Sequence, residues 1–366
     1  MRVTRLFAFA AIVGVASLGF AVALASRAEK PLFNGMKSPL ALGKSAANAG
    51  KTSADCGQCH SEIYRQWQQS QHAQSFADPY FQNAFAKEPY DSCRHCHAPT
   101  AKSVDDTAGL TEAVGCLTCH VRDGQVLAAE KPAQTASQGA APHPILRTAK
   151  LNDTRACATC HEFGFLAAPV KYGKPRFESM ELQQTTLSEW HKSSAGAAKQ
   201  PCQNCHMGPK LTDHTMPGHT PEMLQQAVKI DVSLHKSGQN WDIAVTLLAA
   251  QVGHAVPTGE LFRRLEWCAF DASGAAVARE SFGRTWNSVV QNDRQHGAFR
   301  TRVLDVDTRV MPLPAAAQVR KLVIDAGLLP VRWQLDWVRA EGAEPPGLAA
   351  CRRGTRVEVA RGVFAE

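Results

Sequence analysis

The chain has 366 residues, which is enough for two domains, and a formal net charge of +7. It contains no basic run interleaved with aromatic residues, so nucleic-acid binding is not expected. No phosphate-binding glycine loop, Ser-His-Asp pattern or paired-carboxylate motif stands out either. Twelve cysteines and fourteen histidines remain to be explained.

The first 25 residues are predicted to be an export signal. Arg2 and Arg5 precede a long apolar run, which ends in the small-x-small sequence of residues 23–25. Because the run approaches the roughly 20 residues that span a bilayer, an uncleaved membrane anchor is the alternative. Residues 26–53 are rich in Ala, Gly, Ser and Lys and are predicted to be a flexible lead-in. We therefore expect a periplasmic or otherwise exported protein, with membrane contact only through this N-terminal segment.

Five copies of C-x-x-C-H follow, here numbered first to fifth in chain order. This is the attachment signature of a c-type haem, in which two thiols bind the vinyl groups and the next imidazole binds the iron. Structural zinc or disulfides would not require a histidine after every cysteine pair. We predict five c-type haems. The attachment cysteines are Cys56, Cys59, Cys93, Cys96, Cys116, Cys119, Cys157, Cys160, Cys202 and Cys205, and the proximal ligands are His60, His97, His120, His161 and His206.

Residues 54–223 are predicted to form the pentahaem domain. About 170 residues are too few to cover five macrocycles with a conventional protein core, so the haems themselves must form the core. We expect mostly short helices around the motifs, joined by irregular loops. The haem propionates would bring the net charge of the mature protein to about zero, so bulk charge does not predict an anionic partner.

Residues 224–366 show a different pattern. Apolar and polar residues alternate over 228–234 and 241–247 with a turn between them, which predicts a β-hairpin, and alternate again over 331–337 and 355–359. We predict an antiparallel, immunoglobulin-like β-sandwich, and hence an α+β chain. In an oxidising compartment, Cys268 and Cys351 are slightly more consistent with a disulfide than with two free thiols.

The second axial ligand of each iron decides between an electron carrier and an enzyme. A haem with histidine on both faces carries electrons, whereas an open face can bind a substrate. His72 is the leading candidate, in a segment over 61–76 that lacks Gly and Pro and is predicted to be helical. A continuous helix would place it too far from His60 to bind the same iron, so we expect it to bind a neighbouring haem.

Five further histidines are candidate distal ligands. His143 lies between prolines, His214 and His219 are alternatives in DHTMPGHT with His219 favoured, and His254 lies in GHAVPTG at the end of the hairpin. His191 belongs to a second Trp-x-x-Ser pattern, in which Ala195 stands where His72 stands in the first. Either His191 substitutes for the missing ligand, or one haem lacks a protein ligand. The residues not expected to bind iron are His95, Met207, His235 and His296.

Several of these stretches resemble a known family. The stretch from Cys56 to Ala73 and the blocks CRHCHAP, GCLTCHVRDG, DHTMPGH and GHAVPTG are similar to multihaem cytochromes c related to the tetrahaem cytochrome of ammonia oxidisers, although five motifs are present here rather than four. The resemblance implies periplasmic electron relay, with hydroxylamine oxidoreductase as the donor in that family. It also implies that His72 is a distal ligand, and it favours His143, His219 and His254.

Three functions follow as hypotheses. The first is transfer of electrons along five haems between periplasmic or membrane redox proteins that act as donor and acceptor. The second is an oxidoreductase that acts on a small nitrogen or sulfur species at one open haem. The third is a filament-forming or docking cytochrome.

Overall fold

The computed structural model describes residues 52–122, 124–130, 143–171, 176–208, 210, 212–325, 327–339 and 347–364. The predicted signal or anchor, and all but the last two residues of the predicted lead-in, lie outside the described residues. The described residues all belong to one compact unit. None of the helices within these ranges has the length and apolar character needed to cross a membrane.

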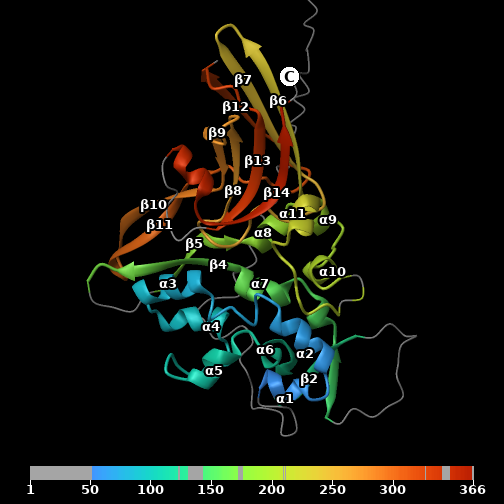
Figure 1. Ribbon diagram of the computed structural model, residues 1–366. Coiled ribbons are helices and arrows are strands. Elements are labelled where there is room, and N and C mark those ends of the chain that lie inside the picture. The colour runs from blue at the N-terminus through green and yellow to red at the C-terminus, as the bar shows by residue number, and fades with distance from the viewer. Residues whose placement is uncertain are drawn as a thin grey trace, which may run out of the picture. The chain divides into compact units, whose positions relative to one another are not determined.

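Short helices carry the five motifs, and antiparallel sheets follow them, so the predicted α+β class is confirmed (Figure 1). Four of the five motifs end a helix at their histidine, whereas His60 of the first motif lies between two helices. The helices are α1 Ser53–Gly57, α2 Ser61–Gln68, α3 Pro79–Lys87, α4 Arg94–His97, α5 Thr107–Glu112, α6 Cys116–His120, α7 Arg155–His161, α8 Thr186–His191, α9 Ser194–Ala197, α10 Cys202–His206 and α11 Pro221–Ala227. Three 3₁₀ turns are η1 Asp91–Cys93, η2 Ala149–Asn152 and η3 Leu348–Arg352.

The helix predicted over 61–76 is shorter than expected. It ends at Gln68, and the chain then turns, so the prediction is wrong for the second half of that segment. The hydroxyl of Ser70 accepts a hydrogen bond from the backbone N–H of Ala73, which competes with helical pairing. The turn directs His72 away from the helix axis, and the carbonyl of His72 accepts a hydrogen bond from Val114 next to the third motif.

Two sheets lie among the motifs, where irregular loops were expected. The first has the order β1-β2-β3, from Val121–Arg122, Gln125–Ala129 and Ile145–Thr148. The second has the order β10-β11-β4-β5, from Arg284–Asp293, Gly297–Asp307, Glu162–Pro169 and Arg176–Thr185. In this sheet the β10–β11 hairpin from the C-terminal half extends beside β4 (Figure 1), so the two halves of the chain share a sheet.

The C-terminal half forms two antiparallel sheets. Their orders are β12-β7-β6 and β14-β13-β8-β9. The predicted hairpin is confirmed, with Ser237 paired to Asn240 across a two-residue turn that Gly238 allows through its positive φ of 63°. The strands are β6 Val228–Ser237, β7 Asn240–Ala249, β8 Arg264–Phe270, β9 Ala276–Phe282, β12 Gln318–Asp325, β13 Arg332–Arg339 and β14 Thr355–Val363.

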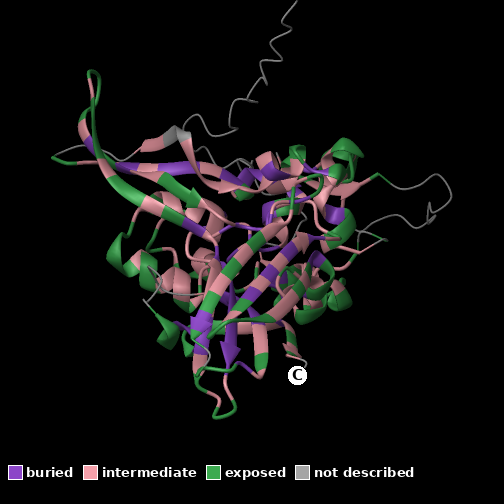
Figure 2. Cartoon of the chain, turned by 90° about the horizontal axis from the view of Figure 1, so that it is seen from above, coloured by how far each residue is buried: buried purple, intermediate pink, exposed green. Residues whose placement is uncertain are grey.

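The hydrophobic core lies between these two sheets. Val245 and Leu247 of one sheet belong to the same buried cluster as Leu265, Trp267 and Leu335 of the other. In Figure 2 buried residues concentrate along the strands, whereas the helices are mostly exposed or intermediate. The core of the described residues therefore depends on the β-strands, and the helices around the motifs contribute little to it.

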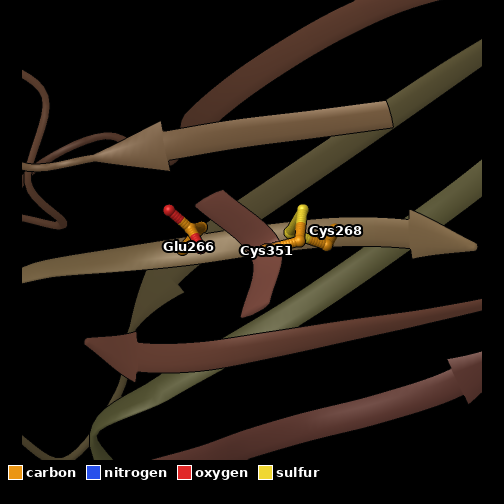
Figure 3. A group of neighbouring side chains, drawn as sticks. All are labelled: Glu266, Cys268 and Cys351. Atoms are coloured by element: carbon orange, nitrogen blue, oxygen red, sulfur yellow. A yellow bond between two sulfur atoms is a disulfide. The ribbon is translucent and has the colours of Figure 1, made fainter. Parts of the chain in front are cut away.

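The predicted disulfide between Cys268 and Cys351 is confirmed, with Cα atoms 6.1 Å apart. Glu266 lies beside it on the same strand as Cys268 (Figure 3). The carboxylate of Glu266 forms ion pairs with Arg264, Arg279 and Arg356. Since the sulfurs are bonded to each other and the carboxylate is taken by arginines, this group is structural and does not form a metal site.

Candidate functional site

Several proximal histidines and distal candidates form a hydrogen bond between Nδ1 and a backbone carbonyl oxygen. When Nδ1–H donates to a backbone carbonyl, Nε2 keeps its lone pair for a metal, and this is the usual arrangement of metal-binding imidazoles. Proximal histidines held in this way are His97 by Ser75 O at 2.7 Å, His120 by Leu127 O at 2.9 Å and His206 by Pro217 O at 2.7 Å. Distal candidates held in this way are His214 by Thr212 O at 2.9 Å and His254 by Ala255 O at 3.0 Å.

Three proximal histidines face a second imidazole. Two imidazoles on one iron place their ring centroids about 6 Å apart, from a metal–nitrogen bond of about 2 Å on each side and about 1 Å within each ring. The observed centroid distances are 6.3 Å for His72 and His161, 6.2 Å for His120 and His214, and 6.1 Å for His206 and His254. Segments distant in the sequence thus meet at the spacing that an iron requires.

Burial favours the neutral form of four of these six rings. Desolvation, followed by the nearby His72, lowers the pKa of His161 to about 3, although solvent reaches part of that ring. Desolvation also lowers the pKa of His72, His120 and His254. A neutral imidazole offers its lone pair to a metal, whereas a protonated one does not.

The motifs contact one another through their cysteines. The side chains of Cys56 and Cys116 hydrogen-bond, as do those of Cys96 and Cys160, and those of Cys157 and Cys202. The first motif therefore adjoins the third, and the fourth adjoins both the second and the fifth. None of these ten cysteines forms a disulfide, so all remain thiols that can form thioethers.

One structural unit occurs twice around the motifs. The indole N–H of Trp67 donates to Val114 O at 2.9 Å, and that of Trp190 donates to Gln200 O at 2.8 Å. Each carbonyl lies two residues before the first cysteine of a motif, the third and the fifth respectively. The Trp-x-x-Ser pattern of the sequence therefore marks a repeated way of fastening a helix to the start of a motif.

The second copy of this unit shows why an alanine, rather than a histidine, stands at position 195. The turn is the same, because Ser193 accepts from the N–H of Gly196 as the serine of the first copy does from Ala73. A Cβ placed on Gly253 would lie 3.1 Å from Cβ of Ala195, so the loop that carries His254 packs directly on Ala195. That position is filled by protein, from the loop that carries His254.

A buried carboxylate holds this loop. Glu189 accepts hydrogen bonds from the N–H of Ala255 at 3.0 Å and from the Thr258 hydroxyl at 2.8 Å, and it pairs with Arg309 at 2.7 Å. Burial disfavours the carboxylate charge, but Arg309 and the hydrogen bonds outweigh it and lower the pKa of Glu189. The sequence gives no sign of this role for Glu189, because its partners are far from it in the chain.

The donor set fits c-type haem. Each motif supplies two thiols and an imidazole, and three motifs face a second imidazole. Residues 55–121, which span the first three motifs, match the family model described as cytochrome c554 and c-prime. The chain also matches the crystal structure of a penta-heme cytochrome c552 from Thermochromatium tepidum, with a TM-score of 0.58 and 20% identity over 86% of this chain and 98% of that one.

The family match over residues 55–121 supports a c-type cytochrome in the region of the first three motifs. The crystal-structure match shows a shared fold. No curated protein matches the sequence. The family match is consistent with the resemblance to the tetrahaem cytochromes of ammonia oxidisers, but it covers only the first three motifs.

The three remaining distal candidates do not belong to the imidazole pairs described above. His219, favoured over His214 from the sequence, stacks on Trp337 with ring centroids 4.7 Å apart, while His214 faces a proximal histidine. His143 is half-buried beside β3 and lies 3.4 Å from Pro144 O through Nδ1. His191 is exposed and packs edge-on against Trp190. Whether any of these binds iron remains a prediction.

Two proximal histidines differ from the other three. Within the described ranges, no second imidazole faces His60 or His97 at the spacing of the three pairs. His60 is exposed, and His97 stacks on Phe81 with centroids 3.7 Å apart. The first and second motifs are therefore the places where a sixth ligand is not assigned by geometry.

Proposed function

We propose that this protein is an exported c-type cytochrome that binds five haems and transfers electrons between redox proteins. The three imidazole pairs are the observation that carries this proposal. Since two imidazoles occupy both axial positions of an iron, such a site has no room for a substrate and is suited to electron transfer. The distal ligands would be His72 for the fourth motif, His214 for the third and His254 for the fifth.

The contacts between motifs support conduction along the chain of sites. Haems attached at the five motifs supply one-electron transfer. The cysteine contacts bring the first motif next to the third, and the second and fifth next to the fourth. At these contacts the protein holds the attachment points of two motifs adjacent to each other, without an intervening layer of side chains.

The first and fifth motifs have solvent-exposed residues that a partner protein could approach. Cys59 and His60 of the first motif and Cys205 of the fifth are exposed, which supports access for a donor and an acceptor at these motifs. We propose that both partners are periplasmic or membrane redox proteins. The division into a haem domain of residues 54–223 and a β-sandwich of residues 224–366 is also proposed. The strand orders β12-β7-β6 and β14-β13-β8-β9 support immunoglobulin-like topology in the latter.

A pair of substitutions in one turn tests the ligand assignment. Loss of His214 should leave the iron of the third motif with one imidazole, so His214→Ala should convert one haem from low spin to high spin in the electron paramagnetic resonance spectrum. His219→Ala, from the same turn, is the matched control and should leave the low-spin signals unchanged. The opposite pattern would reject the pairing of His120 with His214.

The second motif supports one competing function. Because no imidazole faces His97 at the pair spacing among the described residues, a haem there would be the site for an oxidoreductase acting on a small nitrogen or sulfur species. Cyanide titration of the oxidised protein separates the two functions. An all-low-spin spectrum without a cyanide-sensitive component rejects the oxidoreductase, whereas a high-spin component that cyanide removes supports it.

A further inference from the structure

A cavity of about 660 Å³ lies between the β10–β11 hairpin and the segment that leads into β8. One of its lining residues, Arg263, is near enough to His161 of the fourth motif to contribute to lowering the pKa of that histidine. Its size falls within the range of small-molecule sites. Four arginines line it and no carboxylate does: Arg263, Arg264, Arg284 and Arg302. Such a concentration of one charge around a partly open cavity is costly unless an anion is present.

Two of the four arginines are balanced by neighbouring carboxylates. Arg263 pairs with Glu260 at 3.3 Å, and Arg264 pairs with Glu266 at 3.0 Å. Nη2 of Arg264 is nevertheless buried without a hydrogen-bond partner, and only 4% of that residue is exposed. Both residues therefore have a carboxylate partner, although Arg264 shares Glu266 with Arg279 and Arg356.

The other two arginines have no carboxylate partner in the part of the chain that the structure describes. Arg284 is 8% exposed, donates from Nη2 to Gly259 O at 2.7 Å, and has a buried Nη1 without a partner. Arg302 lies over the ring of Phe262, 5.9 Å from its centroid. Burial, and then the nearby Arg309, lowers the pKa of Arg284 to about 10, as expected for an uncompensated guanidinium. The cavity thus has two unbalanced positive charges.

The rest of the lining is suited to an organic group. Leu261, Phe262, Trp286 and Val306 provide apolar surface. The indole Nε1 of Trp286 is buried without a hydrogen-bond partner and is a further donor at the wall. We propose that this cavity binds a small organic dianion, such as an aromatic phosphate ester or dicarboxylate, with its acidic groups on Arg284 and Arg302.

Guanidinium groups suit this ligand because their planar donors pair bidentately with phosphate and carboxylate oxygens. Two charges on the ligand match the two unbalanced arginines, and an aromatic body matches the apolar wall. The site goes beyond electron transfer and does not depend on the assignment of any iron ligand. Its failure would leave the spectroscopic tests of the haem sites unaffected.

Isothermal titration calorimetry on the mature, haem-loaded protein tests the proposal. The probes are phenyl phosphate, phthalate and inorganic phosphate at about pH 8, where a phosphate ester with a second pKa of about 6 is doubly charged. We expect both organic dianions to bind at least about tenfold more tightly than inorganic phosphate, because only they use the apolar wall. Arg302→Gln should weaken their binding about tenfold or more, since a charge-assisted pair is lost.

Arg300→Gln is the matched control. Arg300 is exposed on the same strand, carries the same charge and does not line the cavity, so this variant should bind as the parent does. Equal weakening in both variants would indicate general charge attraction and would overturn the proposal, as would equal affinity for inorganic phosphate. Absence of binding by every probe would also overturn it, including the case in which a haem propionate at the fourth motif occupies the arginines.

Discussion

At the scale of single residues, Glu266 is fully buried and lies among positively charged arginines. Three guanidinium groups contact its carboxylate, and one of them, Arg356, also pairs with the buried Asp336. Burial disfavours the charged carboxylate, but the hydrogen bonds from Arg279 and Arg356 outweigh this and lower the pKa of Glu266. Breaking a buried pair of this kind is costly because it leaves charges without partners.

This network predicts acid sensitivity. Because the pKa of Glu266 is lower in the folded chain than its ordinary value of 4.5, its stabilisation is present above about pH 4.5 and is lost as the pH falls through the folded value. Glu266→Gln should therefore lower the free energy of unfolding by about 3 kcal/mol at pH 7 and reduce the loss between pH 6 and pH 3. Urea denaturation at several pH values measures both effects.

Glu358→Gln is the control, because Glu358 forms a more exposed pair with Arg361. We expect this variant to change the free energy of unfolding by less than about 1 kcal/mol at any of these pH values. Similar losses in the two variants would show that the arginines around Glu266 find other partners.

At the scale of elements, the disulfide connects strand β8 to the 3₁₀ turn before β14. It closes a loop of 83 residues, which contains strands β9 to β13. A covalent link across so long a segment removes many conformations from the unfolded chain. The β-sandwich should depend on it more than any single side-chain contact.

Replacement of Cys268 and Cys351 by Ala together should lower the free energy of unfolding by about 4.5 kcal/mol, by the loop-entropy relation. Unfolding in urea, followed by tryptophan fluorescence, measures the change. A reductant should destabilise the parent protein but not the double variant. If the double variant and the parent unfold at the same urea concentration, the disulfide has no stabilising role.

At the scale of the whole molecule, side chains from both halves of the chain form an ion-paired junction. Arg339 of β13 pairs with Asp78 at 2.6 Å, just before α3, and with Glu260 at 2.7 Å. Tyr80 of α3 donates to the carbonyl of Arg339 at 3.2 Å. The loop of His254, which the second half contributes to the fifth motif, is another contact between the two halves.

Arg339→Gln should loosen this junction, because Asp78 then loses its ion-pair partner and Glu260 keeps only its longer pair with Arg263. We expect a loss of about 1–3 kcal/mol in stability and faster amide hydrogen exchange in α3, measured by mass spectrometry. Arg361→Gln on the adjacent strand is the control, since Arg361 is exposed and its pair is weak. Unchanged exchange in α3 would show that the shared sheet of β4 and β11 suffices to hold the halves together.

The sequence by itself determined the features that depend on local spacing. The attachment motifs could be predicted because two thioethers and one imidazole must come from five consecutive residues. The hairpin over 228–249 could be predicted because an alternating pattern and a glycine turn specify its register. The turn after Gln68 was missed, since the competing hydrogen bond of Ser70 carries no strong signal in the sequence.

Only the tertiary structure decided which distant residues meet. It brings His214 rather than His219 to His120, and it fills the place beside Ala195 with the loop of His254. It also gathers four arginines from separate segments around one cavity. The physical reason is that these contacts depend on packing between segments far apart in the chain, which local periodicity does not encode.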